Sequence, residues 1–175
     1  MNFGDYESAI ADSDKAIKLN ADAAQAYNNR GLAKMNLGEL DDAIAAFDKA
    51  IDLESEYFDA YLGRGNAFRL MEEYARAISD FDRANMLDPR DPGPYLNRGL
   101  ANLSLAKYDQ AIADFDRATD LDPNNWQAYA GRGFAYAELG DPDQATAELE
   151  AAMSLATDSD SRAIIQDALE ELSGQ

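Results

Sequence analysis

One stretch of the chain, residues 94–123, reads PYLNRGLANLSLAKYDQAIADFDRATDLDP. Apolar and small residues recur at helical spacing on both sides of a short break at Ala106-Lys107, which predicts two helices joined by a turn. Proline is tolerated in the first turn of a helix but cannot continue one, so Pro94 marks the start of the pair and Pro123 its end. The stretch therefore predicts one helical hairpin.

The residues of this hairpin return along the chain at an offset of 34, in seven columns. The columns are Tyr27, Tyr61, Tyr95 and Tyr129; Arg30, Arg64, Arg98 and Arg132; Gly31, Gly65, Gly99 and Gly133; Ala43, Ala77, Ala111 and Ala145; Phe47, Phe81, Phe115 and Leu149; Ala50, Ala84, Ala118 and Ala152; and Leu53, Leu87, Leu121 and Leu155. Repetition at this period is typical of arrays of helical hairpins. The glycine and alanine columns let two helices approach closely, and the aromatic columns fill the space beside that contact.

These columns resemble the tetratricopeptide repeat, whose pattern has an aromatic residue, a glycine, Ala-x3-Phe and a closing proline. The resemblance extends over essentially the whole chain. The closing proline is present at Pro89 and Pro123 but is replaced by Ser55 and Thr157. The resemblance implies an all-α fold, a right-handed α-solenoid of antiparallel helical hairpins, in which the first helix of each hairpin lines a concave groove.

The period divides the chain into a single array with an incomplete start. Residues 1–23 match only the end of a repeat, so we expect a second helix there without its hairpin partner. Either the natural protein extends upstream, or another chain covers this helix. Ser13 stands in the phenylalanine column of this helix, which suits a partly exposed terminal position. The tail has one apolar and one polar helical face, as expected of a capping helix. The complete repeats and the cap are residues 24–57, 58–91, 92–125, 126–159 and 160–175.

The amino-acid composition argues against an enzymatic function. The chain has no cysteine and no histidine, which removes disulfides, typical zinc sites and the usual catalytic triads. It also lacks phosphate-binding, dinucleotide-binding and calcium-loop motifs. We therefore expect no enzymatic activity, no catalytic residue, no cofactor and no metal site.

Charge and hydropathy limit the partners. The 34 acidic and 15 basic residues give a net charge of −19, which disfavours nucleic acids and anionic membranes. No apolar run approaches the roughly 20 residues of a membrane-spanning helix, and the first residues lack the features of a signal peptide. Cytoplasm is the default expectation for the location.

The groove predicted by the resemblance is less acidic than the rest of the chain, so we predict a protein–protein interaction scaffold that binds a helical or extended peptide. Its leucines would contact the apolar face of a helix, and its asparagines would hydrogen-bond an extended backbone. The alternative, that the leucines pack between repeats, stays open for each residue. The predicted binding residues are Asn28, Asn29, Leu32, Met35, Leu62, Asn66, Arg69, Leu96, Asn97, Leu100, Leu103 and Phe134.

One known ligand class of the family is disfavoured. The resemblance implies that chaperone-binding members hold a C-terminal carboxylate with basic residues of the groove. The basic residues are absent here, so we do not expect Hsp70 or Hsp90 tails as partners. The matching positions are Asn28, Leu32, Gly63, Gly93 and Asn97.

The arginine column allows two interpretations. Four arginines at constant spacing suggest an anion-binding stripe, but aspartates recur with the same period. We favour a structural role, in which each arginine pairs with a carboxylate of a neighbouring second helix, because a charge beside an apolar interface needs a partner. The candidate partners are Asp48, Asp80, Asp82, Asp114 and Asp116.

Two other functions remain as alternatives. The unpaired first helix exposes Tyr6, Ile10 and Ile17 in this interpretation, so a second copy of the chain would cover it and form a homo-oligomer. Alternatively, the array is a targeting module of a larger enzyme. The identity of a protein or peptide partner does not follow from the sequence.

Overall fold

The computed structural model describes residues 3–174 of the chain, with side chains from residue 5 onward. Within them the secondary structure is entirely helical, and the predicted all-α fold is confirmed. The chain forms two compact units, which we call unit 1 (Met1–Pro89) and unit 2 (Arg90–Gln175), and each is described by itself. No helix of the described residues is both long and apolar enough to span a bilayer.

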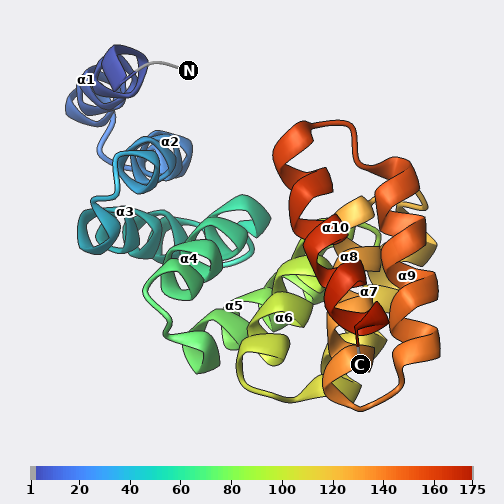
Figure 1. The fold of residues 1–175 in the computed structure, drawn as a ribbon. Coiled ribbons are helices and arrows are strands. Elements are labelled where there is room, and N and C mark those ends of the chain that lie inside the picture. Colours follow the sequence, from blue (N-terminus) through green and yellow to red (C-terminus); the bar gives the residue numbers. More distant parts are fainter. Residues whose placement is uncertain (1–2, 175) are drawn as a thin grey trace. The chain divides into compact units, whose positions relative to one another are not determined.

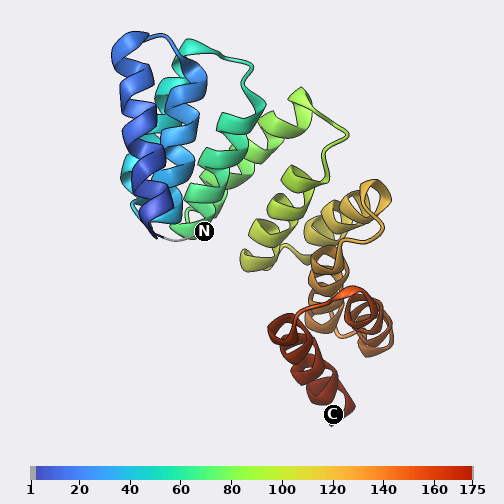
Figure 2. The same cartoon turned by 90° about the horizontal axis from the view of Figure 1, so that it is seen from above.

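Unit 1 contains one single helix followed by two hairpins (Figure 1). Each helix packs on the next, and the first helices of the two hairpins also contact each other. Figure 2 shows the first two helices of the unit side by side along their lengths. The helices are α1 (Phe3–Leu19), α2 (Ala24–Asn36), α3 (Leu40–Leu53), α4 (Phe58–Leu70) and α5 (Tyr74–Leu87).

Unit 2 contains two hairpins followed by a single helix, and its first helices likewise contact each other. The last helix packs on the second hairpin through Ile165, Leu169 and Leu172, so it caps the apolar face of that hairpin. The helices are α6 (Pro92–Ser104), α7 (Tyr108–Leu121), α8 (Trp126–Glu138), α9 (Pro142–Leu155) and α10 (Ser159–Ser173).

Acceptor side chains cap the starts of four unit 2 helices, whereas α7 has no such cap. Asp91 accepts a hydrogen bond from the backbone N–H of Gly93 at 2.7 Å, before α6. Asn125, Asp141 and Asp158 accept in the same way before α8, α9 and α10. Such caps satisfy N–H groups that have no partner inside a helix.

The turn inside every hairpin contains one residue with left-handed backbone. The φ angles are 79° at Gly38, 61° at Glu72, 55° at Ala106 and 77° at Gly140. These four positions are 34 residues apart, so the turn is the same in each hairpin. Glycine adopts this conformation without strain, whereas Glu72 and Ala106 do not.

Buried phenylalanines interlock with glycines of two first helices. A Cβ atom on Gly31 would lie 2.7 Å from the ring of Phe47, and one on Gly63 would lie 2.6 Å from the same ring. In unit 2, Phe115 lies in the same way between Gly99 and Gly131. Each ring is therefore enclosed by its own hairpin and by the first helix of the next one.

The contact between α9 and the capping helix α10 combines side chains of other sizes than the phenylalanine–glycine contacts do. Leu149 replaces phenylalanine in its column, and Ile165 stands 34 residues after Gly131. Both side chains are fully buried in one cluster. A smaller residue on α9 thus faces a larger one on α10, and the core stays filled.

Candidate peptide-binding site

The arginine column ties first helices to second helices in unit 1. Arg64 of α4 donates from Nε and Nη2 to the carboxylate of Asp80 on α5, at 2.8 and 2.7 Å, and from Nη1 to Asp48 on α3. The hydrogen bonds to Asp80, and then to Asp48, raise the pKa of Arg64 above its usual value despite burial. Arg30 of α2 donates to Asp14 of α1 at 3.2 Å.

Unit 2 repeats this arrangement. Arg98 donates from Nε and Nη2 to Asp114, at 3.1 and 2.5 Å. Arg132 donates to Glu148 at 2.7 Å and to Asp116, and these two partners raise its pKa although burial acts in the opposite direction.

The predicted structural role of the arginine column is therefore confirmed, because all four arginines pair with carboxylates of second helices. Two observed partners lie outside the predicted set, Asp14 of α1 and Glu148 of α9, although they stand 34 residues from Asp48 and Asp114.

Two residues of the predicted groove are buried and cannot line a surface. Asn28 of α2 is buried, with no hydrogen-bond partner for its Oδ1. Leu96 of α6 belongs to the core cluster around Phe115. Asn28 and Leu96 stand in one column of the repeat, and this column faces the second helices and not the groove. The prediction that these two residues line the groove is therefore wrong.

The remaining unit 1 residues lie along α2 and α4. Asn29 and Leu32 are exposed, and the side chain of Leu32 is 37% accessible. Met35 packs against the cluster around Phe47, and Leu62 packs against the cluster around Phe81. These two apolar side chains stabilise the hairpins as well as bordering the surface.

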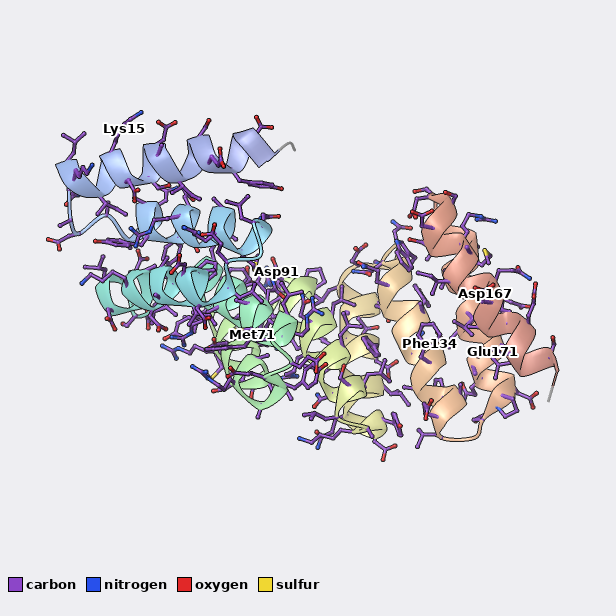
Figure 3. All side chains as sticks on the ribbon, turned by 60° about the vertical axis from the view of Figure 1, so that its left-hand side comes forward. Lys15, Met71, Asp91, Phe134, Asp167 and Glu171 are labelled. Carbon is purple, nitrogen blue, oxygen red and sulfur yellow. The ribbon has the colours of Figure 1, made fainter. Side chains whose placement is uncertain are left out.

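The predicted unit 2 residues are largely engaged within the unit. Leu100 and Leu103 pack against the cluster around Phe115. Asn97 donates from Nδ2 to the carbonyl of Gly93 at 2.9 Å. Phe134 packs against α10, and Glu171 of that helix lines the same pocket as Phe134 (Figure 3). A charge at Phe134 would therefore disturb the packing of α10.

Two half-buried residues of α4 each contain a buried polar atom that has no hydrogen bond to the described part of the chain. Asn66 Oδ1 and Arg69 Nε are both buried atoms with no hydrogen-bond acceptor or donor among the described residues. Burial lowers the pKa of Arg69, and no carboxylate pairs with it there. The two residues are three positions apart and share one face of α4. The chain has 34 acidic residues, yet among the described residues none of their carboxylates pairs with this half-buried guanidinium.

The N-terminal helix is packed more closely than the sequence suggested. Ser13 is only 7% exposed, and its hydroxyl donates to the Ala9 carbonyl at 2.8 Å. Tyr6, Ile10 and Ile17 are half-buried. The expectation of a partly exposed Ser13 and of three exposed apolar residues was wrong, because α1 lies along α2.

Helical hairpins with a period of 34 and small-to-aromatic interlocking define a helical-repeat scaffold. Sequence models of the tetratricopeptide repeat match residues 3–38, 24–57, 58–91 and 107–170, and the chain belongs to this family of protein-interaction scaffolds.

Solved structures share the fold. The crystal structure of MamA is 27% identical over 87% of this chain and 89% of that chain, with a TM-score of 0.80. MamA 41-end from Desulfovibrio magneticus RS-1 is 24% identical over 87% and 86%, with a TM-score of 0.81. YrrB, described as a TPR protein with an unusual peptide-binding site, is 24% identical over 94% and 84%, with a TM-score of 0.77. Among curated protein sequences there is no match.

Proposed function

We propose that this chain is a scaffold that binds an acidic, apolar peptide segment of a partner protein along the first helices of unit 1. The observation that carries the proposal is the pair of unpartnered polar groups on α4, Asn66 Oδ1 and Arg69 Nε. Buried polar atoms without hydrogen bonds cost free energy, and because both residues are only half-buried, a ligand can contact the accessible part of each side chain and offer the partners that the fold does not.

The chemistry of the two groups defines the ligand. The guanidinium of Arg69 pairs best with a carboxylate, to which it can donate two parallel hydrogen bonds. Asn66 is half-buried, and the accessible part of its amide can hydrogen-bond a peptide backbone. Leu32 and Leu70 of the same unit are exposed, Leu70 to 52%, and offer apolar contacts beside these polar ones. The peptide therefore combines an aspartate or glutamate with leucine-like side chains.

The distribution of acidic residues along the chain also favours an acidic peptide at the first helices. Carboxylates concentrate on the second helices, as at Asp41, Asp42 and Asp48 of α3, whereas α2 has no acidic residue. An acidic peptide therefore meets less repulsion on the first helices than elsewhere on a protein of net charge −19.

The test uses labelled peptides in which one glutamate is flanked by leucines, and the same peptides with glutamine in its place. The neighbouring repeats supply substitutions that the fold accepts, because Met35 and Leu103 occupy the column of Arg69. Fluorescence anisotropy should show tighter binding of the glutamate peptide to the wild-type chain. Arg69→Met should weaken that binding about tenfold or more and abolish the difference between the two peptides.

Arg76→Met is the matched control. Arg76 is an exposed arginine of the same unit that pairs with Glu73 at 2.6 Å, so this variant has the same change in net charge. It should bind both peptides as the wild-type chain does. If Arg69→Met retains full preference for the glutamate peptide, the site proposed at α4 is wrong.

A further inference from the structure

A pocket of about 490 Å³ lies in unit 2 where α8, α9 and α10 meet, and we call it the α10 pocket. Leu149 of α9 lines it and is fully buried, whereas Leu172 of α10 is half-buried. Phe134 of α8 and Glu171 of α10 line it as well (Figure 3). The volume lies within the range of roughly 300–1,000 Å³ that is typical of ligand sites in proteins.

The α10 pocket arises from three departures from the repeat. Three of its lining residues are smaller than the residues that precede them by 34 positions: Leu149 stands in the column of Phe115, Ala168 in that of Phe134, and Pro142 in that of Tyr108. Each replacement removes an aromatic ring from a position beside the pocket. The space is therefore a property of this junction between a hairpin and the next helix.

A continuation of the repeat would leave the pocket open. Arg132 and Gly133 of α8 face the second helix that follows it, α9. The equivalent residues of α10 are Gln166 and Asp167, and neither lines the pocket. A second helix after α10 in a longer chain would lie on the face of Gln166 and Asp167, so it would not compete for the pocket.

Two exposed glutamates give the mouth of the pocket a negative charge. Glu138 accepts a hydrogen bond from the hydroxyl of Tyr108 at 3.1 Å, which leaves its charge uncompensated. Glu171 forms no ion pair with the described part of the chain. Both carboxylates attract a cation in the pocket.

The helices around the pocket have no cation to spare. Arg132 of α8 and Arg162 of α10 are the basic residues of α8, α9 and α10. Arg132 pairs with Glu148, and Arg162 donates to the backbone carbonyls of Met153 and Ala156. The occupant therefore brings the positive charge.

We propose that the α10 pocket binds an arginine side chain of a partner protein. The apolar stem of the arginine packs on the apolar wall of the pocket, as long charged side chains commonly do. Its planar guanidinium stacks on the ring of Phe134 and pairs with Glu138 and Glu171. This site does not involve the polar groups of α4, so the two proposals succeed or fail separately.

A second copy of the chain is a poorer occupant. Two chains that each carry a net charge of −19 repel each other, whereas the same charge attracts a basic segment of another protein.

The probes are a labelled peptide with one arginine between two leucines, and the same peptide with citrulline, which keeps the shape of arginine but has no charge. Two variants of the full chain address the pocket. Ala168→Phe fills it with the residue that Phe134 places in the same column, and Glu171→Gln removes one charge at its mouth. Circular dichroism with thermal unfolding verifies that both variants are folded.

Glu170→Gln is the matched control. Glu170 is the exposed neighbour of Glu171 and does not line the pocket, so this variant has the same change in net charge. It separates binding in the pocket from general attraction of a cation to an acidic protein.

Fluorescence anisotropy should show that the wild-type chain binds the arginine peptide about tenfold or more tightly than the citrulline peptide. Ala168→Phe should weaken binding of the arginine peptide at least tenfold, because the new ring occupies the pocket. Glu171→Gln should weaken it about threefold to tenfold and narrow the difference between the two peptides, whereas Glu170→Gln and Arg69→Met should bind as the wild-type chain does.

Three results overturn the proposal. In the first, Ala168→Phe is folded and binds the arginine peptide as tightly as the wild-type chain does. In the second, Glu171→Gln and Glu170→Gln weaken binding equally, so that only the net charge attracts the peptide. In the third, sedimentation shows that the wild-type chain self-associates and that Ala168→Phe abolishes the association; the occupant is then a second copy.

Discussion

Phe115 occupies the space in which a side chain on Gly131 would stand, since a Cβ atom there would lie 2.5 Å from the Cζ atom of the ring. The ring cannot move away easily, because Gly99 of its own hairpin is as close on another side. This contact joins the two hairpins of unit 2, as Phe47 and Gly63 join those of unit 1.

We expect Gly131→Ala to lower the free energy of unfolding by about 1–2 kcal/mol, because overpacking outweighs the better helix propensity of alanine. Urea unfolding followed by circular dichroism measures it. Adding Phe115→Leu to Gly131→Ala should cost less than the sum of the two single changes, since leucine leaves room for the methyl group. Additive costs would show that the ring and the glycine are not coupled.

Replacing Arg64 should cost more stability than replacing Asp80, although the two residues form one ion pair. Arg64→Met leaves the side chain of Asp80, 7% exposed, without its two hydrogen bonds, and should cost about 2–4 kcal/mol. Asp80→Ala should cost less, because Arg64 retains Asp48 and because Ala46 occupies the equivalent position in the preceding hairpin. Chemical unfolding of both variants gives the order, and equal costs would contradict it.

Replacing Arg69, which lies on the same helix as Arg64, should not destabilise the fold. Arg69→Met removes a half-buried guanidinium that has no carboxylate partner among the described residues, so the free energy of unfolding should stay constant or rise by up to about 1 kcal/mol. A calorimetric melting curve suffices. A loss of stability comparable to that of Arg64→Met would mean that Arg69 serves the fold and not a ligand.

The left-handed turn residues predict a stabilising change. Ala106→Gly removes the strain of an L-residue at a φ of 55°, partly offset by the extra freedom of glycine in the unfolded chain, and should add about 0.5–1 kcal/mol. Glu72→Gly should act similarly in unit 1. Gly140→Ala is the converse substitution at the same turn, and it should lower the melting temperature.

The cap of α10 predicts a pH-dependent contribution. The backbone N–H of Ser161 donates to Asp158 and lowers the pKa of that carboxyl group. A carboxyl whose pKa is lower in the folded state stabilises the fold above its unfolded pKa and loses that effect as pH falls through the folded pKa. The stability difference between the wild-type chain and Asp158→Ala should therefore be constant near neutral pH and shrink below about pH 4. A difference that grows with acidification would contradict this account.

Much of the fold was predictable because the period of 34 pairs a column of glycines with a column of large side chains. Gly99 and Phe115 define a hairpin, and the arginine and aspartate columns indicate their own pairing. The binding site was less predictable. A first helix contacts its own second helix and the helices of neighbouring hairpins, and the sequence alone does not tell which of its faces remains free.

Leu96 and Leu32 illustrate this limit. Both were assigned to the surface, yet Leu96 is buried and Leu32 is exposed. A cleft of about 490 Å³ also lies between α1 and α2, and the sequence contains a signal for it. Ser13 in the phenylalanine column and Asp12 in the acidic column together mark a second helix that keeps the charge of the interlock but not its bulk.

The matched sizes at the hairpin contacts also limit how such a gene can lengthen. A tandem copy of the segment encoding α2 and α3 would bring the side chain of Asn29 against Phe47, where Gly63 now stands. A tandem copy of α4 and α5 would instead present another Gly63 to Phe81, and the new contact would repeat the one between Phe47 and Gly63. Duplication of the second segment is therefore the event that this protein could survive without compensating mutations.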